Sequence, residues 1–135
     1  MKYLVDANVL SEPTKQAPSG RVIDWLRESE RDLCVDPIIL GELRIGVLSL
    51  APGRKRVKLE AWFDALVQTV QCLAWDAKVS GRWAGLVVDL KRKGRVMPLP
   101  DGMIAATALE YELTVATRNT RDFRKAGVKV FDPFA

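Results

Sequence analysis

Four short apolar runs alternate with longer helical segments in this chain, and this alternation restricts the fold more than any other feature. The runs span residues 2–5, 33–35, 114–116 and 128–131, and each has the length and composition of a buried strand. Strands separated by helices pair in parallel, because the chain crosses back over the sheet before the next strand starts. The sequence therefore predicts a three-layer α/β fold, in which a mainly parallel sheet is covered by helices on both faces. Its 135 residues are enough for one such domain, spanning residues 1–135.

Prolines, capping residues and apolar periodicity mark the helices. Asp36 is an N-cap followed by a proline at the first helical position, and Asp76 caps another helix. We predict helices over residues 21–29, from 37 onward, over 54–69 and 77–93, and one that starts at Pro100. The helix over 77–93 is expected to bury a stripe formed by Val79, Trp83, Leu86, Val87 and Leu90. Residues 70–74 fit either a short strand or an extended connector.

Two acidic residues occupy positions that point to a site. Asp6 directly follows the first strand, at the edge where open α/β sheets bind ligands. Glu42 falls between Ile38 and Ile45 on one side of its helix and Ile39 on the other, so it should face inward. A carboxylate in an apolar arc is costly unless it is paired, hydrogen-bonded or bound to a metal. The ordinary alternative for Glu42 is a salt bridge to an arginine.

Two further acidic residues belong to the stretch from 99 to 123. Asp101 lies at a helix start, and the same helix face carries only Ala105 and Ala108, so another backbone can approach this carboxylate closely. Residues 117–122 read as a polar turn after a buried strand, and Asp122 lies at the end of this turn. Taken singly, Asp101 and Asp122 have an ordinary explanation as caps.

The four acidic residues can meet at one edge of a parallel sheet. Carboxylates in one pocket repel each other unless protons or a hard cation neutralise them, and Mg²⁺ or Mn²⁺ suits a set of oxygen ligands. The chain contains no histidine, which excludes Ser-His-Asp, Cys-His and other histidine-based catalysis. A metal site of this kind activates water and stabilises the developing charge of a phosphodiester, as a nuclease requires. The predicted metal ligands and catalytic residues are Asp6, Glu42, Asp101 and Asp122, with Asn8, Thr117 and Asn119 as supporting residues.

A basic cluster opens the helix over residues 54–69. The net charge of +4 is compatible with an anionic partner such as nucleic acid. Cations at a helix start oppose the macrodipole, so a function other than helix stability can explain them, although a solvated face is the simpler reading. The candidate RNA-binding residues are Arg54, Lys55, Arg56 and Lys58.

Four motifs in order resemble a PIN domain and, more closely, the VapC-like toxins of bacterial toxin–antitoxin pairs. They are LVDANVLSE, GELRIGV, DGMIAATA and TVATRNTRDF, and together they cover essentially the whole chain. The resemblance implies an Mg²⁺- or Mn²⁺-dependent ribonuclease that a small antitoxin holds inactive. It also implies a homodimer and a toxin–antitoxin complex that binds operator DNA through the antitoxin.

The same resemblance assigns residues. Asp6, Glu42 and Asp101 match the acidic ligands of the family, and the fourth acidic position falls within TRNTRDF. The family commonly has Thr or Ser where this chain has Ala7, and many relatives have Asp where it has Asn119. The fourth role therefore falls either to the Asn119 amide or to Asp122.

Two other function classes fit parts of this pattern. A receiver-type signalling domain has a similar length, a similar α/β order and an acidic Mg²⁺ site, but it needs an acidic pair after the first strand, where Asp6 stands alone. A non-catalytic binding module of the PIN fold is the second alternative. No apolar stretch is long enough for a membrane span and the N-terminus has no signal-like segment, so we expect a cytoplasmic protein without a membrane partner.

Overall fold

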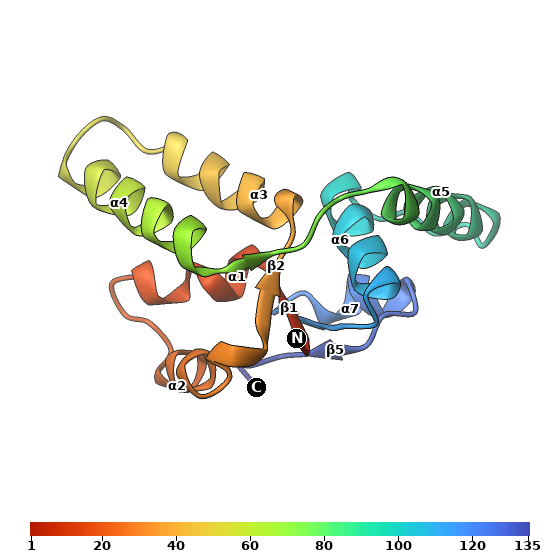
Figure 1. The fold of residues 1–135 in the computed structure, drawn as a ribbon, viewed down its shortest axis with the longest axis horizontal. Helices are drawn as coiled ribbons and strands as arrows, with labels where there is room; N and C mark the ends of the chain where they lie inside the picture. Colours follow the sequence, from red (N-terminus) through yellow and green to blue (C-terminus); the bar gives the residue numbers. More distant parts are fainter.

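A five-stranded sheet in which every strand pair is parallel forms the centre of the computed structural model, which describes residues 1–135. The strand order is β3-β2-β1-β4-β5, so β1 is the central strand (Figure 1). The strands are β1 (Tyr3–Val5), β2 (Leu33–Val35), β3 (Gln71–Cys72), β4 (Thr114–Ala116) and β5 (Val130–Phe131). The predicted α/β class with a parallel sheet is confirmed.

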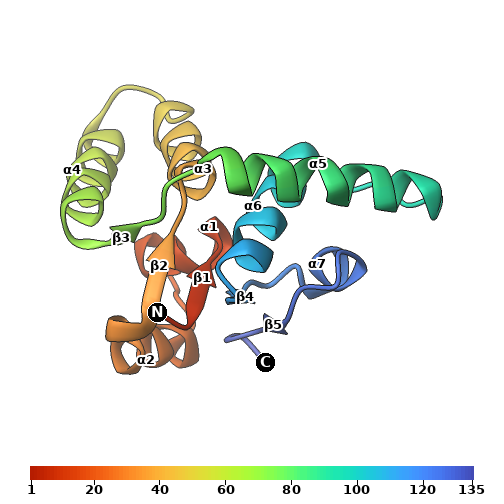
Figure 2. The same ribbon diagram turned by 45° about the vertical axis from the view of Figure 1, so that its right-hand side comes forward.

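Seven α-helices and two short 3-10 helices surround this sheet (Figures 1 and 2). The α-helices are α1 (Ala7–Leu10), α2 (Gly20–Glu28), α3 (Pro37–Leu48), α4 (Arg54–Thr69), α5 (Ala77–Arg92), α6 (Leu99–Glu110) and α7 (Thr120–Lys125). The 3-10 helices are η1 (Glu12–Thr14) and η2 (Glu30–Asp32). None of the helices combines the length and the apolar character that crossing a membrane requires.

Predicted and observed strands differ mainly at the ends of the chain. β2 and β4 have the predicted bounds, β1 starts one residue late, and the segment over 70–74 contains the edge strand β3. The last strand is shorter than predicted: the Val128 backbone N–H bonds to the Phe123 carbonyl, so this residue closes the turn after α7 instead of pairing in the sheet. Val128 is buried in this turn, and a buried β-branched residue next to a strand is hard to distinguish from a strand residue in the sequence.

Two helices were missed because each is short. The predicted polar turn over residues 117–122 ends at Asn119, and the rest of it forms the first half of α7. α1 begins directly after Asp6, whose side chain caps it. Four to six residues are too few to show an apolar period, so a sequence pattern does not separate such helices from turns.

The sheet is buried on both faces. Leu4, Val5 and Val115 have no exposed surface, as expected for central parallel strands. On α2, the ring of Trp25 packs edge-on against Tyr3 at 5.1 Å between ring centroids and also contacts the ring of Phe131. α6 contributes small side chains to the core, so it approaches its neighbours closely.

The predicted stripe on α5 is only partly buried. Val79 and Leu90 lie in the interior, but Val87 is 43% exposed. α5 packs mainly along α6, and this contact leaves Val87 and Val88 exposed. Val87 therefore faces solvent beside the connection to α6.

All strands point the same way, so their carboxyl ends share one edge of the sheet. Asp6 follows β1, Asp36 follows β2 and Thr117 follows β4. α6 leads into the amino end of β4, which places its own start, with Asp101, towards the opposite edge, the one shared by the carboxyl ends. This edge contains the candidate site.

Candidate active site

Asp6 is held in one orientation by three hydrogen bonds. The Ala7 backbone N–H donates to Oδ1 at 2.8 Å, and the Thr117 hydroxyl donates to Oδ2 at 2.8 Å. The side-chain amide of Asn8 donates to Oδ2 at 3.2 Å. Burial raises the pKa of Asp6 above its ordinary value, although the three hydrogen bonds act in the opposite direction.

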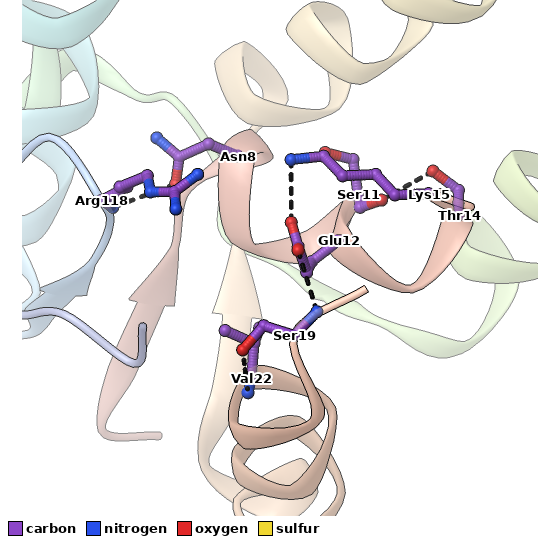
Figure 3. Close-up of polar contacts among 8 residues, drawn as sticks. All are labelled: Asn8, Ser11, Glu12, Thr14, Lys15, Ser19, Val22 and Arg118. Atoms are coloured by element: carbon purple, nitrogen blue, oxygen red, sulfur yellow. Dashed lines mark hydrogen bonds and ion pairs between the residues drawn. The ribbon is translucent and has the colours of Figure 1, made fainter. Parts of the chain in front are cut away.

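Asn8 and Thr117 also tie the loop after β4 to the start of α1. The Asn8 amide donates to the Thr117 hydroxyl at 3.3 Å, and its carbonyl oxygen accepts from the backbone N–H of Arg118 at 3.1 Å (Figure 3). Thr117 accepts from the backbone N–H of Asn119 at 3.0 Å. These two predicted supporting residues orient Asp6 and the loop that carries Asn119.

Asn119 joins two of the predicted ligands. Its side-chain nitrogen donates to Oδ2 of Asp101 at 3.3 Å and to Oδ2 of Asp122 at 3.0 Å. Asp122 also forms an ion pair with Lys125 through Oδ1 at 3.5 Å. The Asn119 amide thus neutralises part of the repulsion between the two carboxylates by donating hydrogen bonds to both.

Glu42 lies at the site without a polar partner. Its Oε1 is buried and accepts no hydrogen bond, and no arginine or lysine pairs with it, so the salt-bridge alternative is wrong. Burial, followed by the like charges of Asp6 and Asp101, raises its pKa to about 7. Glu12 shows the opposite case: it pairs with Lys15 at 2.8 Å, which lowers its pKa (Figure 3).

Asp101 occupies the first turn of α6, as predicted. Burial, followed by the carboxylates of Asp6 and Asp122, raises its pKa to about 6. The position at a helix N-terminus favours a negative charge, yet burial and the like charges outweigh this effect. The carboxylate of Asp6 raises the pKa of both Glu42 and Asp101, which indicates that these three acidic groups are electrostatic neighbours.

The donor chemistry at this edge fits a hard divalent cation. No three acidic side chains lie closely enough together in this structure to hold a metal ion, so Asp6, Glu42 and Asp101 do not form an assembled ligand set here. The buried oxygen of Glu42 has no protein partner, and the neighbouring acidic groups of Asp6 and Asp101 also offer oxygen ligands. Mg²⁺ and Mn²⁺ prefer such oxygen ligands.

Asp36 is a buried acidic residue that the sequence identified only as a helix cap. It is 1% exposed, and it bonds both to the Ile39 backbone N–H at 2.9 Å and to the Thr107 hydroxyl at 2.7 Å. Burial raises its pKa, and its charge raises that of Glu42. Thr107 is 71 residues away in the chain, so no local pattern signals this contact.

A groove of about 1070 Å³ leads away from Glu42 and Asn8 between α1, α3 and α4. Of the four predicted RNA-binding residues, Arg54, Lys55 and Lys58 line it. Arg56 does not line this groove, because its guanidinium pairs with Glu60 at 3.0 Å. Three of the four cations are therefore available along a path that continues from the acidic site.

The strand order excludes the receiver-type alternative. Receiver domains have the order 2-1-3-4-5, whereas this sheet has the order 3-2-1-4-5. In the present fold, the first strand is flanked by the second and the fourth, which brings Asp6 next to Thr117 across adjacent strands.

Known proteins share this fold and sequence pattern. The PIN domain family model matches residues 3–129. Among curated relatives, toxin FitB of Neisseria gonorrhoeae is 36% identical over 135 residues, covering 97% of each chain. VapC ribonuclease Y4jK of Sinorhizobium fredii is 31% identical and covers 97% of this chain and 96% of its own.

A solved structure agrees with these relatives. The structure of FitAB bound to an IR36 DNA fragment superposes with a TM-score of 0.91 at 34% identity, covering 98% of this chain and 96% of that one. The resemblance inferred from the four sequence motifs is thereby confirmed. The fold, the family model and these relatives agree that the chain belongs to the PIN domain family.

Proposed function

We propose that the protein is an Mg²⁺- or Mn²⁺-dependent endoribonuclease and the toxin of a toxin–antitoxin pair. The observation that carries this proposal is the buried, unpartnered carboxylate oxygen of Glu42 beside two other carboxylates with raised pKa values. Such a group of acids is stable at neutral pH only with protons or a cation. Relatives named a toxin and a VapC ribonuclease support the nuclease assignment.

Asp6, Glu42 and Asp101 are the residues that would hold the ion. A bound Mg²⁺ or Mn²⁺ supplies a water of lowered pKa and stabilises negative charge on a phosphodiester. Thr117 and Asn8 hold Asp6 in orientation. We assign the fourth position to Asp122, because a divalent cation gains more from its full charge than from the Asn119 amide.

RNA is the substrate we infer, bound along the groove lined by Arg54, Lys55 and Lys58. These cations would neutralise phosphates on one side of the groove, and Trp62 offers an aromatic surface inside it. An RNA-cleaving toxin in the cytoplasm would require an inhibitor, and we propose that a small antitoxin has this role. Operator DNA would then be a partner only through the antitoxin, in keeping with the DNA-bound FitAB structure.

A homodimer belongs to the same proposal. Val87, Val88, Val96 and Leu99 are exposed apolar residues around the end of α5 and the start of α6. Val87, Val96 and Leu99 line a groove of about 490 Å³. Exposed apolar surface of this kind is typical of a protein interface.

Cleavage of a mixed RNA pool by the purified protein tests the proposed function. We expect cleavage with Mg²⁺ or Mn²⁺, loss of cleavage with EDTA and recovery when the metal is restored in excess. Asp6→Asn is the matched control for a contaminating nuclease, because asparagine preserves the shape of the side chain. Metal-independent RNA binding without cleavage would instead favour the non-catalytic PIN-fold module.

Charge reversal at the start of α4 tests the RNA path. Lys55→Glu combined with Lys58→Glu is expected to weaken RNA binding and to reduce the slope of log affinity against log salt by about 1.4, since each lost phosphate contact on a single strand removes about 0.7. Filter binding at several salt concentrations measures both quantities. Reversing Arg92 and Lys93, exposed at the end of α5, makes the same change in net charge away from the groove. Equal effects of the two double variants would show that only net charge matters.

A further inference from the structure

Asp36 and Thr107 form a polar link between the two helices that carry Glu42 and Asp101. Asp36 precedes α3, and its Oδ1 accepts from the Ile39 backbone N–H at 2.9 Å. Its Oδ2 accepts from the Thr107 hydroxyl of α6 at 2.7 Å. With both oxygens bonded and only 1% of the residue exposed, Asp36 is not available as a metal ligand.

The link is separated from Glu42 and from Asp101 by the same number of residues along each helix. Glu42 is six residues after Asp36 along α3, and Asp101 is six residues before Thr107 along α6. At a rise of 1.5 Å per residue, the backbone positions of Glu42 and Asp101 each lie about 9 Å along the helix axis from the link. A small shift of one helix against the other at this point would therefore change the separation of Glu42 and Asp101.

No other polar contact joins these two helices. α3 and α6 lie against each other (Figure 2), and the side chains at their junction are apolar, including Ile39, Ile104 and Ala105. Apolar packing favours close approach but is non-directional, so it resists sliding and rotation weakly. A buried hydrogen bond to a carboxylate is short and directional, and breaking it leaves a buried charge unsatisfied.

We propose that the Asp36–Thr107 hydrogen bond is a positioning brace, which sets the separation of Glu42 and Asp101 and thereby the affinity of the site for a divalent cation. The inference rests on the proposed function in one respect, namely that these two carboxylates bind the ion. Asp36 and Thr107 are positioning residues and do not contact the ion or the RNA. Misplacement of a reacting group by about 1 Å can cost on the order of a hundredfold in rate, so a brace of this kind has a measurable effect.

Mn²⁺ titration of the purified variants by calorimetry tests the brace. Thr107→Val keeps the volume of the side chain but removes the hydroxyl, and we expect Mn²⁺ affinity to fall about tenfold, within the range that supporting groups at metal sites contribute. Thr107→Ser keeps the hydroxyl, and its affinity should remain within about twofold of the wild type. Asp76→Ala is the control for stability alone, because it removes a cap bond of the same kind, from Val79 at 3.0 Å, at the start of α5.

Asp36→Asn removes the charge of Asp36 but keeps the shape of the side chain, so it distinguishes a geometric role from an electrostatic one. An asparagine retains the cap oxygen, and its amide can donate to the Thr107 oxygen while the hydroxyl turns to the Met103 carbonyl, 3.4 Å away. The brace thus predicts a smaller loss for Asp36→Asn than for Thr107→Val, whereas a purely electrostatic role predicts the reverse order. If Thr107→Val does not fold, Asp36→Ala replaces it, because it removes the same charge as Asp36→Asn and also removes the bond to Thr107. Equal Mn²⁺ affinity in Asp36→Ala and Asp36→Asn would then contradict the brace.

The outcomes distinguish the brace from the proposed function. Wild-type affinity in Thr107→Val contradicts the brace alone. Mn²⁺ binding by the wild type without RNA cleavage contradicts the ribonuclease proposal but leaves the brace measurable. A wild type that binds no Mn²⁺ contradicts both.

Discussion

Replacing Asp101 with asparagine is expected to reduce metal-dependent RNA cleavage by more than about a hundredfold. Groups that only support a metal site typically contribute 10- to 100-fold, and Asp101 would be a direct ligand. The melting temperature of the metal-free variant should stay unchanged or rise, because burial and two like charges raise the pKa of this carboxyl to about 6. Cleavage rates and thermal unfolding of the same preparations measure both effects.

Two neighbouring variants provide an order of effects within the site. Asp122→Asn should weaken metal binding and activity less than Asp101→Asn, because Lys125 already offsets part of its charge. Asn119→Ala should have the smallest effect, since it removes a hydrogen-bond donor but no charge. Retained activity in Asp101→Asn would remove this residue from the proposed ligand set. Normal metal affinity in Asp122→Asn would move the fourth position to Asn119 or leave three acidic ligands.

We expect the thermal stability of the metal-free protein to fall as the pH rises. The stabilisation by a divalent cation should have the opposite pH dependence and grow as the pH rises. Burial and neighbouring carboxylates raise the pKa of Glu42 from 4.5 to about 7 and that of Asp101 from 3.8 to about 6. The folded state therefore binds more protons than the unfolded state over this interval, and stability falls as the pH rises from about 4 to 7. Glu12, whose pKa is lowered, acts in the opposite direction but is a single group.

Metal binding competes with these protons and so becomes stronger as the pH rises. At a concentration one hundred times its dissociation constant, Mn²⁺ would add about 2.7 kcal/mol. For a domain of this size, that corresponds to an increase of roughly 10 °C in melting temperature. The increase should be large at pH 8 and small at pH 5, as measured by differential scanning calorimetry.

Glu42→Gln provides the control for this pH dependence. It removes a carboxyl whose pKa is raised to about 7, so the metal-free melting temperature should change less between pH 5 and 7 than in the wild type. The increase caused by Mn²⁺ should also shrink. A metal-free protein that becomes more stable as the pH rises through this interval would contradict the sign derived from Glu42 and Asp101.

Local chemistry made most of the secondary structure predictable. The bounds of β2, β4 and α4 agree with the prediction, and the starts of α3 and α5 follow from Asp36 and Asp76 acting as caps. Caps, prolines and apolar periodicity act within a few residues, so the sequence shows them directly. Short elements such as α1 and α7 have no such periodicity and were missed.

The sequence by itself also determined the family and the chemical type of the site. Four motifs in order identified the PIN domain, the absence of histidine excluded one class of catalysis, and the apolar neighbours of Glu42 predicted an inward carboxylate. Each of these features depends on residue identity and spacing along the chain. None requires knowledge of which distant segments meet.

Only the tertiary structure decided which groups satisfy one another at the site. It left Glu42 without a cation, placed the Asn119 amide between Asp101 and Asp122, and joined Asp36 to Thr107 across 71 residues. These contacts depend on how β1, β4, α3 and α6 pack, and hydrogen bonds between distant segments leave no periodic signal in a sequence. The sequence specifies the carboxylates, whereas packing determines which of them are paired and which remain without a partner.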